Sequence, residues 1–207
     1  MGVLSVAAAA AMLSVTGLQH LRAAVARHQA RDAWESAPVL RPLEEAPTLA
    51  ANTGARPKRW PLGASVARLV IPRIDFDEVV VEGVDARELA AGPGHLPGSV
   101  LPGEAGNAVI SAHRDRHFRR LDKVAVGDTV ITETNRGSVT WRVVRRFIAE
   151  RDAPVLYATP STTLTLTTCW PVRYFGPAPD RLILTAEPVR QGRITVAGRD
   201  PAPAEGR

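Results

Sequence analysis

Short runs of β-branched and apolar residues, bounded by Gly, Pro, Asn or Asp, recur from residue 65 to residue 186. This pattern predicts β-strands at 65–71, 77–82, 107–113, 128–134, 138–148, 163–169 and 180–186. Only one short helix is expected among them, with Asp85 as its N-cap and Glu88 in the capping-box position. Many short strands with tight turns and little helix predict an all-β domain built as a small, mainly antiparallel barrel.

The two ends of the 207-residue chain do not share this pattern. Its first eighteen residues carry no charged side chain. The length of this uncharged run is close to the roughly 20 residues that a helix needs to cross a bilayer. We therefore predict five segments along the chain. They are a membrane-spanning segment at 1–20, a juxtamembrane helix at 21–36, a proline-rich linker at 37–63, a folded domain at 64–190 and a tail at 191–207.

The orientation of the N-terminal segment is left open by its charges. No basic residue precedes the apolar run, whereas Arg22, Arg27 and Arg31 follow it. The positive-inside rule would then place the folded domain in the cytoplasm. An exported domain requires either a start further upstream with basic residues, or arginines held outside by anionic phospholipid headgroups.

Cys169 is the only cysteine, which excludes an internal disulfide. It follows the threonine-rich stretch 163–168, and Pro171 cannot donate to a strand ladder, so Cys169 should lie at a strand end. A thiol there opens onto loops that can hold a substrate and supply a base. The alternative is a small buried cysteine that packs like alanine.

The net charge of +5 does not by itself indicate a nucleic-acid partner, because the arginines are scattered without an aromatic platform. No acidic cluster or glycine-rich phosphate loop predicts a cofactor. His113 and His117 have a spacing that suits metal on a helix, but no helix is expected there. Arg114 and Arg116 would also repel a cation, so we expect no metal site.

Three short motifs stand out along the chain: Ser111-Ala112-His113-Arg114-Asp115, Thr165-Leu166-Thr167-Thr168-Cys169, and Arg181 in the following strand. Together they resemble the signatures of sortases, the membrane-anchored cysteine transpeptidases. The segments His95–Gly98 and Leu101–Glu104 resemble the stretch before the catalytic histidine in class D and E sortases and in the Gram-negative type. The resemblance covers residues 64–188.

Membership of this family implies an eight-stranded β-barrel and a transpeptidation reaction. A C-terminal sorting signal of another protein would be cut and joined to an amine. The resemblance assigns Cys169 as nucleophile, His113 as acid and base, and Arg181 as the group that holds substrate and stabilises the oxyanion. Thr168 matches the threonine beside the nucleophile.

Three further residues are candidates for binding substrate. Trp170 either covers the groove or packs in the core. Asp115 either orients His113 or forms a turn salt bridge with an arginine. His95 either approaches the cleft or packs within its loop.

The resemblance also implies partners and a location. The expected partners are exported proteins with a C-terminal sorting signal, an amine acceptor such as a peptidoglycan precursor, and membrane lipid through the N-terminal helix. The chain would be a single-pass protein of the cell membrane with its catalytic domain outside the cytoplasm. Two alternatives stay open: a tethered β-barrel binding module with a structural cysteine, and a cysteine peptidase that uses water as the acceptor.

Overall fold

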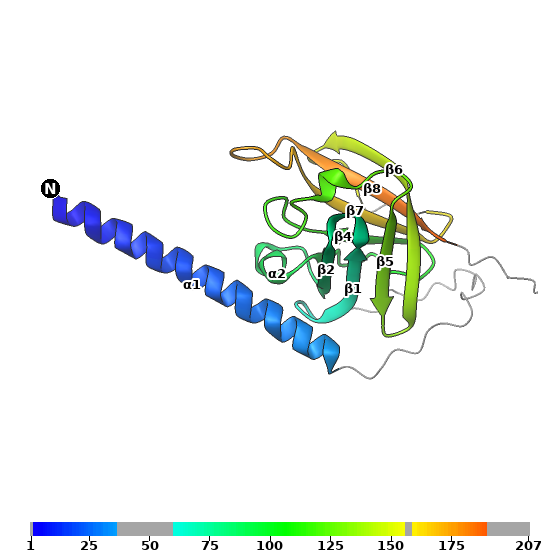
Figure 1. The fold of residues 1–207 in the computed structure, drawn as a ribbon, viewed down its shortest axis with the longest axis horizontal. Coiled ribbons are helices and arrows are strands. Elements are labelled where there is room, and N and C mark those ends of the chain that lie inside the picture. Colours follow the sequence, from blue (N-terminus) through cyan, green and yellow to red (C-terminus); the bar gives the residue numbers. More distant parts are fainter. Residues whose placement is uncertain (1, 37–59, 156–158, 190–207) are drawn as a thin grey trace, which may run out of the picture.

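The computed structural model describes residues 2–36, 60–155 and 159–189, with side chains described from residue 17 onward. A long helix, α1 (Gly2–Glu35), lies beside a barrel of eight strands (Figure 1). The strands are β1 (Ser65–Ile71), β2 (Phe76–Glu82), β3 (Gly94–His95), β4 (Asn107–Ser111), β5 (Thr129–Thr134), β6 (Gly137–Glu150), β7 (Thr163–Trp170) and β8 (Asp180–Pro188). Short helical turns are α2 (Ala86–Ala91), η1 (Pro72–Ile74) and η2 (Leu121–Lys123). The predicted eight-stranded barrel is confirmed.

The strands close in the order β1-β2-β3-β4-β7-β8-β6-β5. Two pairs, β2 with β3 and β4 with β7, are parallel, and the others are antiparallel. The parallel pairing of β4 with β7 aligns Asn107 with Thr163 and Ser111 with Thr167. Because both strands run in the same direction, the loop after β4 emerges next to the end of β7.

Side chains along β7 alternate between the barrel core and the outer face of the barrel. Leu164 and Leu166 point into the apolar interior, with 0% and 1% of their surfaces exposed. Since side chains alternate along a strand, Thr165, Thr167 and Cys169 lie on the outer face. The nucleophile candidate is therefore placed outside the core.

Some details differ from the sequence-based expectations. The two-residue strand β3 was not among the predicted strands. The strand expected at 107–113 ends at Ser111, because the chain turns after Ala112 and the Phe118 amide donates to the His113 carbonyl at 3.1 Å. The short helix begins after Asp85 as predicted, but the Asp85 side chain makes no capping hydrogen bond.

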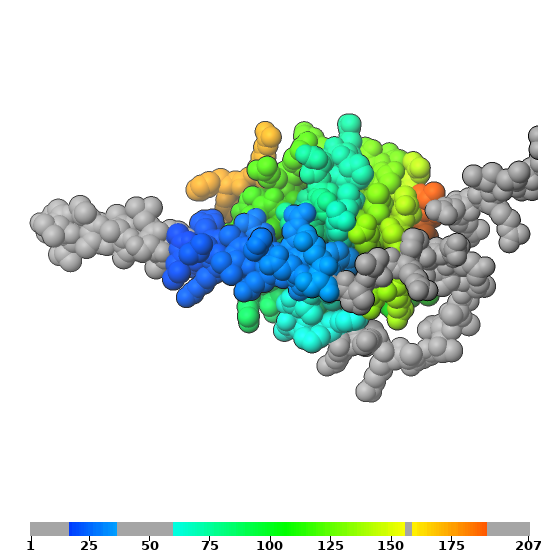
Figure 2. Space-filling view, turned by 60° about the horizontal axis from the view of Figure 1, so that its bottom comes forward, coloured from blue at the N-terminus to red at the C-terminus, as the bar shows by residue number. Residues whose placement is uncertain are grey.

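Helix α1 lies against β1, β2 and α2 (Figures 1 and 2). Its Ala23 is buried, and the Ala30 carbonyl accepts a hydrogen bond from Ser65 Oγ at 3.0 Å. No helix in the described residues is long and apolar enough to cross a membrane. Most of the predicted linker 37–63 and all of the predicted tail 191–207 lie outside the described residues.

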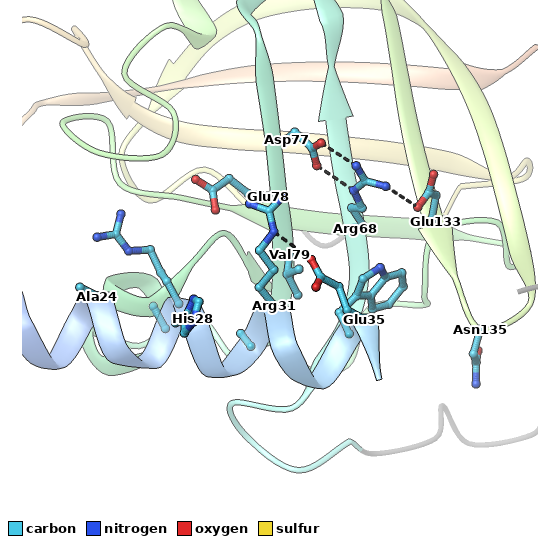
Figure 3. A pocket seen from close by; sticks show the side chains of 14 residues that line it. Ala24, His28, Arg31, Glu35, Arg68, Asp77, Glu78, Val79, Glu133 and Asn135 are labelled. Atoms are coloured by element: carbon cyan, nitrogen blue, oxygen red, sulfur yellow. Dashed lines mark hydrogen bonds and ion pairs between the residues drawn. The ribbon is translucent and has the colours of Figure 1, made fainter. Parts of the chain in front are cut away.

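A groove of about 650 Å³ separates the C-terminal half of α1 from β1, β2 and β5 (Figure 3). On its floor Arg68 holds Asp77 with bonds of 2.6 and 2.7 Å and Glu133 with one of 3.2 Å. The hydrogen bonds with Arg68 hold the pKa of Asp77 below its usual value, and the charge of Arg31 on α1 adds to this effect. Attraction between Arg31 on α1 and Asp77 on β2 therefore contributes to the position of α1.

Candidate active site

Cys169 lies one residue before the end of β7 and pairs directly with Arg181 on β8. Both side chains are half-buried, whereas Thr167 and Ile183, the pair two residues away on the same face, are almost completely buried. The outer face of β7 and β8 is thus closed along most of its length and opens at Cys169 and Arg181. This opening is where a substrate can reach the thiol.

The loop after β4 brings His113 alongside Cys169. The Ala112 amide donates to the Thr167 carbonyl at 3.2 Å, which extends the β4–β7 register by one residue beyond Ser111. Thr168 Oγ1 donates to the Ala112 carbonyl at 2.7 Å and lies inside the barrel with 1% exposure. Thr168 therefore fastens the backbone that carries His113. A direct contact of Thr168 with substrate stays a prediction.

Arg181 is held by the β6–β7 loop. Its Nε donates to the Arg151 carbonyl at 2.6 Å. Among the described residues, its terminal nitrogens make no other hydrogen bond, and Cys169 makes none with His113 or Arg181. The guanidinium is thus fixed at one edge while its two Nη groups are free to donate to a ligand.

The pKa of His113 lies below the ordinary value for histidine. Burial is the main cause, because it disfavours the charged imidazolium, and the charges of Arg116 and His117 act in the same direction. Asp115 acts in the opposite direction through its charge. Asp115 itself is exposed and makes no hydrogen bond with His113 in the described residues, so its effect on His113 is electrostatic.

Arg114, which the sequence analysis did not assign to the site, joins the His113 loop to the loop between β7 and β8. Its Nη1 donates to the Pro171 carbonyl at 2.9 Å and its Nη2 to the Gly176 carbonyl at 2.6 Å. Its guanidinium also lies 5.7 Å from the centre of the Tyr174 ring. The only signal in the sequence was its position beside His113.

Trp170 is half-buried and packs against the core cluster, with Arg146 5.8 Å from its ring centre. It follows Cys169 directly but points toward the opposite face of β7. This position fits the core-packing alternative, and a role in covering the groove stays a prediction.

His95 lies apart from Cys169, in a buried network between β2, β3 and β4. Its Nδ1 is 2.6 Å from Glu82 Oε2, and its Nε2 is 2.8 Å from Ser99 Oγ and 3.0 Å from the Val100 carbonyl. Ser99 Oγ accepts from the Val109 amide at 3.3 Å. The structure thus places His95 in loop packing. Sequence reasoning missed Glu82 and Ser99, because neither lies in a recognisable motif.

The fold and the site together define a class of protein: a closed β-barrel that presents one cysteine, one histidine and one arginine on adjoining strand ends. A cysteine acyl-transfer enzyme uses these three residue types as nucleophile, base and oxyanion donor, and those roles for Cys169, His113 and Arg181 stay a prediction here.

Comparison with known proteins identifies the family. The family model for the sortase domain matches residues 69–189, so the chain belongs to the sortase family, as its motifs predict. It is 36% identical to sortase D of Bacillus subtilis (strain 168) over 124 residues, which are 59% of this chain and 63% of that protein. The matched region thus spans less than two thirds of the length of that relative.

Solved structures of sortases have the same fold. The Clostridium perfringens sortase D5 transpeptidase matches with a TM-score of 0.57 and 28% identity, over 63% of this chain and 82% of that chain. Streptococcus agalactiae sortase C1 matches with a TM-score of 0.55 and 30% identity, over 60% and 69%. The sequence predicted a class D/E-like or Gram-negative-type sortase, and the similarity to sortase D and to the sortase D5 transpeptidase fits the class D-like alternative.

Proposed function

We propose that this protein is a sortase transpeptidase that cuts the C-terminal sorting signal of exported proteins and transfers the product to an amine at the cell surface. The pairing of Cys169 with Arg181, with His113 at the adjacent strand end, is the observation that carries the proposal. Similarity to sortase D and to the sortase D5 transpeptidase supports the reaction type.

In the first step, His113 takes the proton of the Cys169 thiol, and the sulfur attacks the carbonyl carbon of the scissile amide. The carbonyl oxygen becomes an oxyanion that the Nη groups of Arg181 can hold. When the C–N bond breaks, His113 gives its proton to the leaving amine and a thioester remains on Cys169.

In the second step, an acceptor amine attacks the thioester carbonyl and loses a proton to His113. The C–S bond then breaks, the new amide leaves, and the thiolate regains the proton from His113. Arginine suits this site because it keeps its charge throughout and does not compete for the proton that His113 moves.

The location is part of the proposal. The apolar run at residues 1–20 would hold the chain in the cell membrane, with the catalytic domain outside the cytoplasm. A peptidoglycan precursor is one candidate for the amine. The association of sortases with the cell envelope supports this location.

The reaction is tested with a peptide library and a primary amine, with products read by mass spectrometry. We expect both cleavage and ligation, and we expect Cys169→Ala to abolish both with an unchanged melting temperature, because the side chain is small and half-buried. Cleavage without ligation would favour the peptidase alternative. A wild-type protein with no activity and an unreactive thiol would favour the binding module.

Arg181→Lys tests the oxyanion role. Lysine keeps the charge but loses the planar fork of donors, so turnover should fall by about 10² to 10³, roughly 3 to 4 kcal/mol of transition-state stabilisation. Arg145→Lys on the exposed surface of β6 is the matched control and should change neither turnover nor melting temperature. Near-wild-type turnover of Arg181→Lys would show that charge alone is sufficient.

A further inference from the structure

A second groove, of about 520 Å³, lies between α1 and the loop that carries His113. We call it the basic groove and define it by the residues that line it: His20, Ala23 and Arg27 from α1, Ile74, Asp75, Phe76 and Glu78 from η1 and β2, and Asp115, Arg116, His117, Arg119 and Arg120 from the loop. Cys169, His113 and Arg181 are not among its lining residues, and the proposed reaction makes no use of it.

The four arginines of the basic groove have no ion-pair or hydrogen-bond partner in the part of the chain that the structure describes. Elsewhere Arg31, Arg68 and Arg136 each form an ion pair with a carboxylate. By contrast, the side chains of the four groove arginines make no ion pair or hydrogen bond with any described residue, although three carboxylates line the same groove. All four arginines are exposed. Unpaired guanidinium groups are donors available for an anionic ligand.

A buried imidazole in the same groove, that of His117, makes no hydrogen bond with a described residue and has only a long ion-pair contact with Glu78. The His117 side chain is 3% exposed, and its Nδ1 lies 3.8 Å from Glu78 Oε1, beyond hydrogen-bonding distance. Its Nε2 is buried and forms no hydrogen bond with a described residue. A buried polar atom without a partner destabilises the fold, so a groove of this kind indicates a polar group that the protein binds.

The position of the basic groove along α1 indicates the source of the polar ligand. Ala23 and Arg27 follow the segment 1–20 that we propose to be in the membrane, and His20 is the last residue of that segment. On the same part of α1, Leu18, Leu21 and Val25 are exposed. The groove therefore lies where the helix would leave the bilayer.

The loop between β7 and β8 extends toward the same end of the molecule as the N-terminal part of α1. It is the orange segment that projects toward the N-terminal side of α1 in Figures 1 and 2. Tyr174 and Phe175 in this loop are 51% and 103% exposed, and Arg114 ties the loop to that of His113. Exposed aromatic rings beside arginines are typical of surfaces that contact the membrane–water interface.

We propose that the basic groove binds the phosphate of an anionic phospholipid headgroup and thereby seats the barrel, with its active site, on the membrane surface. The inference rests on the membrane anchoring in the proposed function. It favours the second explanation for Arg22, Arg27 and Arg31, in which arginines after the apolar run lie on headgroups outside the cytoplasm.

The test is hydrogen–deuterium exchange on the full chain reconstituted in vesicles of phosphatidylcholine alone or with phosphatidylglycerol. We expect amides of residues 113–120 to exchange at least about tenfold more slowly with phosphatidylglycerol, since each arginine near an anionic surface contributes about fivefold to binding. The variant R116Q/R119Q/R120Q should lose this protection. The variant R136Q/R142Q/R145Q, which removes the same charge from β6 and its hairpin, should keep it.

Two further arms separate the sources of phosphate and the two proposals. Inorganic phosphate added to the chain in detergent should slow the exchange of amides 113–120 only a little. If it slowed exchange as much as phosphatidylglycerol vesicles do, the groove would bind a soluble anion and the proposed binding of a phospholipid headgroup would be overturned. Equal exchange in both vesicle types, or protection that survives in R116Q/R119Q/R120Q, would also overturn it. Flotation with phosphatidylcholine vesicles and peptide cleavage, measured separately, report on the anchor and on the catalytic proposal.

Discussion

The acid–base behaviour of His113 is determined by its own loop. Burial lowers its pKa, Arg116 and His117 lower it further, and Asp115 raises it. A lowered pKa leaves the imidazole neutral at pH 7, which is the form that can accept the Cys169 proton. The residues of the loop around His113 thus set the pKa of the proposed base.

Opposite substitutions in this loop should move that pKa in opposite directions. Asp115→Asn removes the charge that raises the pKa of His113, so the pKa should fall, and Arg116→Gln removes a charge that lowers it, so the pKa should rise. NMR titration of the imidazole measures both. The acidic limb of the pH–rate profile should move the same way as each pKa.

Asp152→Asn, an exposed carboxylate outside this loop, is the control and should leave the titration of His113 unchanged. If Asp115→Asn raised the pKa of His113, the carboxylate would not act through its charge.

At the scale of elements, the barrel is completed by its shortest strand. β3 has two residues and joins β2 on one side to β4 on the other, with Gly94 paired to Val81 and His95 to Ile110. A Cβ on Gly94 would collide with the Gly83 carbonyl, so only glycine fits there. So short a strand supplies few backbone bonds, and the buried Glu82–His95 contact adds to its attachment.

Glu82→Gln should therefore reduce the free energy of unfolding by about 1–3 kcal/mol, because it weakens the charged hydrogen bond to His95. The two side chains are buried, with 6% exposure for Glu82 and 3% for His95. Glu133→Gln, which makes the same change in a surface ion pair with Arg68, should cost less than about 1 kcal/mol. Urea denaturation measures both. Equal losses would mean that the buried contact does not hold β3.

At the scale of the whole molecule, α1 is attached to the barrel by few contacts, and we expect the barrel to be stable without it. The core cluster is made of barrel and loop residues between 66 and 186, and it includes none of the α1 residues whose side chains the structure describes. The attachment includes the burial of Ala23, one hydrogen bond from Ser65, and charge attraction across a groove.

Deletion of residues 1–36 should therefore leave a folded barrel that cleaves peptide, with a loss of roughly 1–2 kcal/mol for the missing hydrogen bond and contacts. Circular dichroism melting and peptide cleavage test this. An aggregated or inactive product would show that the barrel depends on α1.

Much of this protein was determined by local sequence. Alternation of apolar and polar residues places the strands, since a half-buried strand needs that period. The motifs around His113, Cys169 and Arg181 identify the family without any knowledge of their positions in space. Strand ends were misplaced, as at Ser111, because a strand stops where its partner or a turn ends the pairing. The two-residue strand β3 was missed, because it is too short to carry a pattern of its own.

Tertiary structure decided what those residues can do together. Pairing of β4 with β7 joins Ala112 to Thr168 across 56 residues of sequence, and neither strand specifies that partner by itself. The same is true of His95, which is buried against Glu82, and of the basic groove, which needs α1 beside the His113 loop. Propensity and period are properties of neighbours in sequence. Burial, charge environment and ligand geometry depend on contacts between segments far apart in the chain, so only the folded barrel defines them.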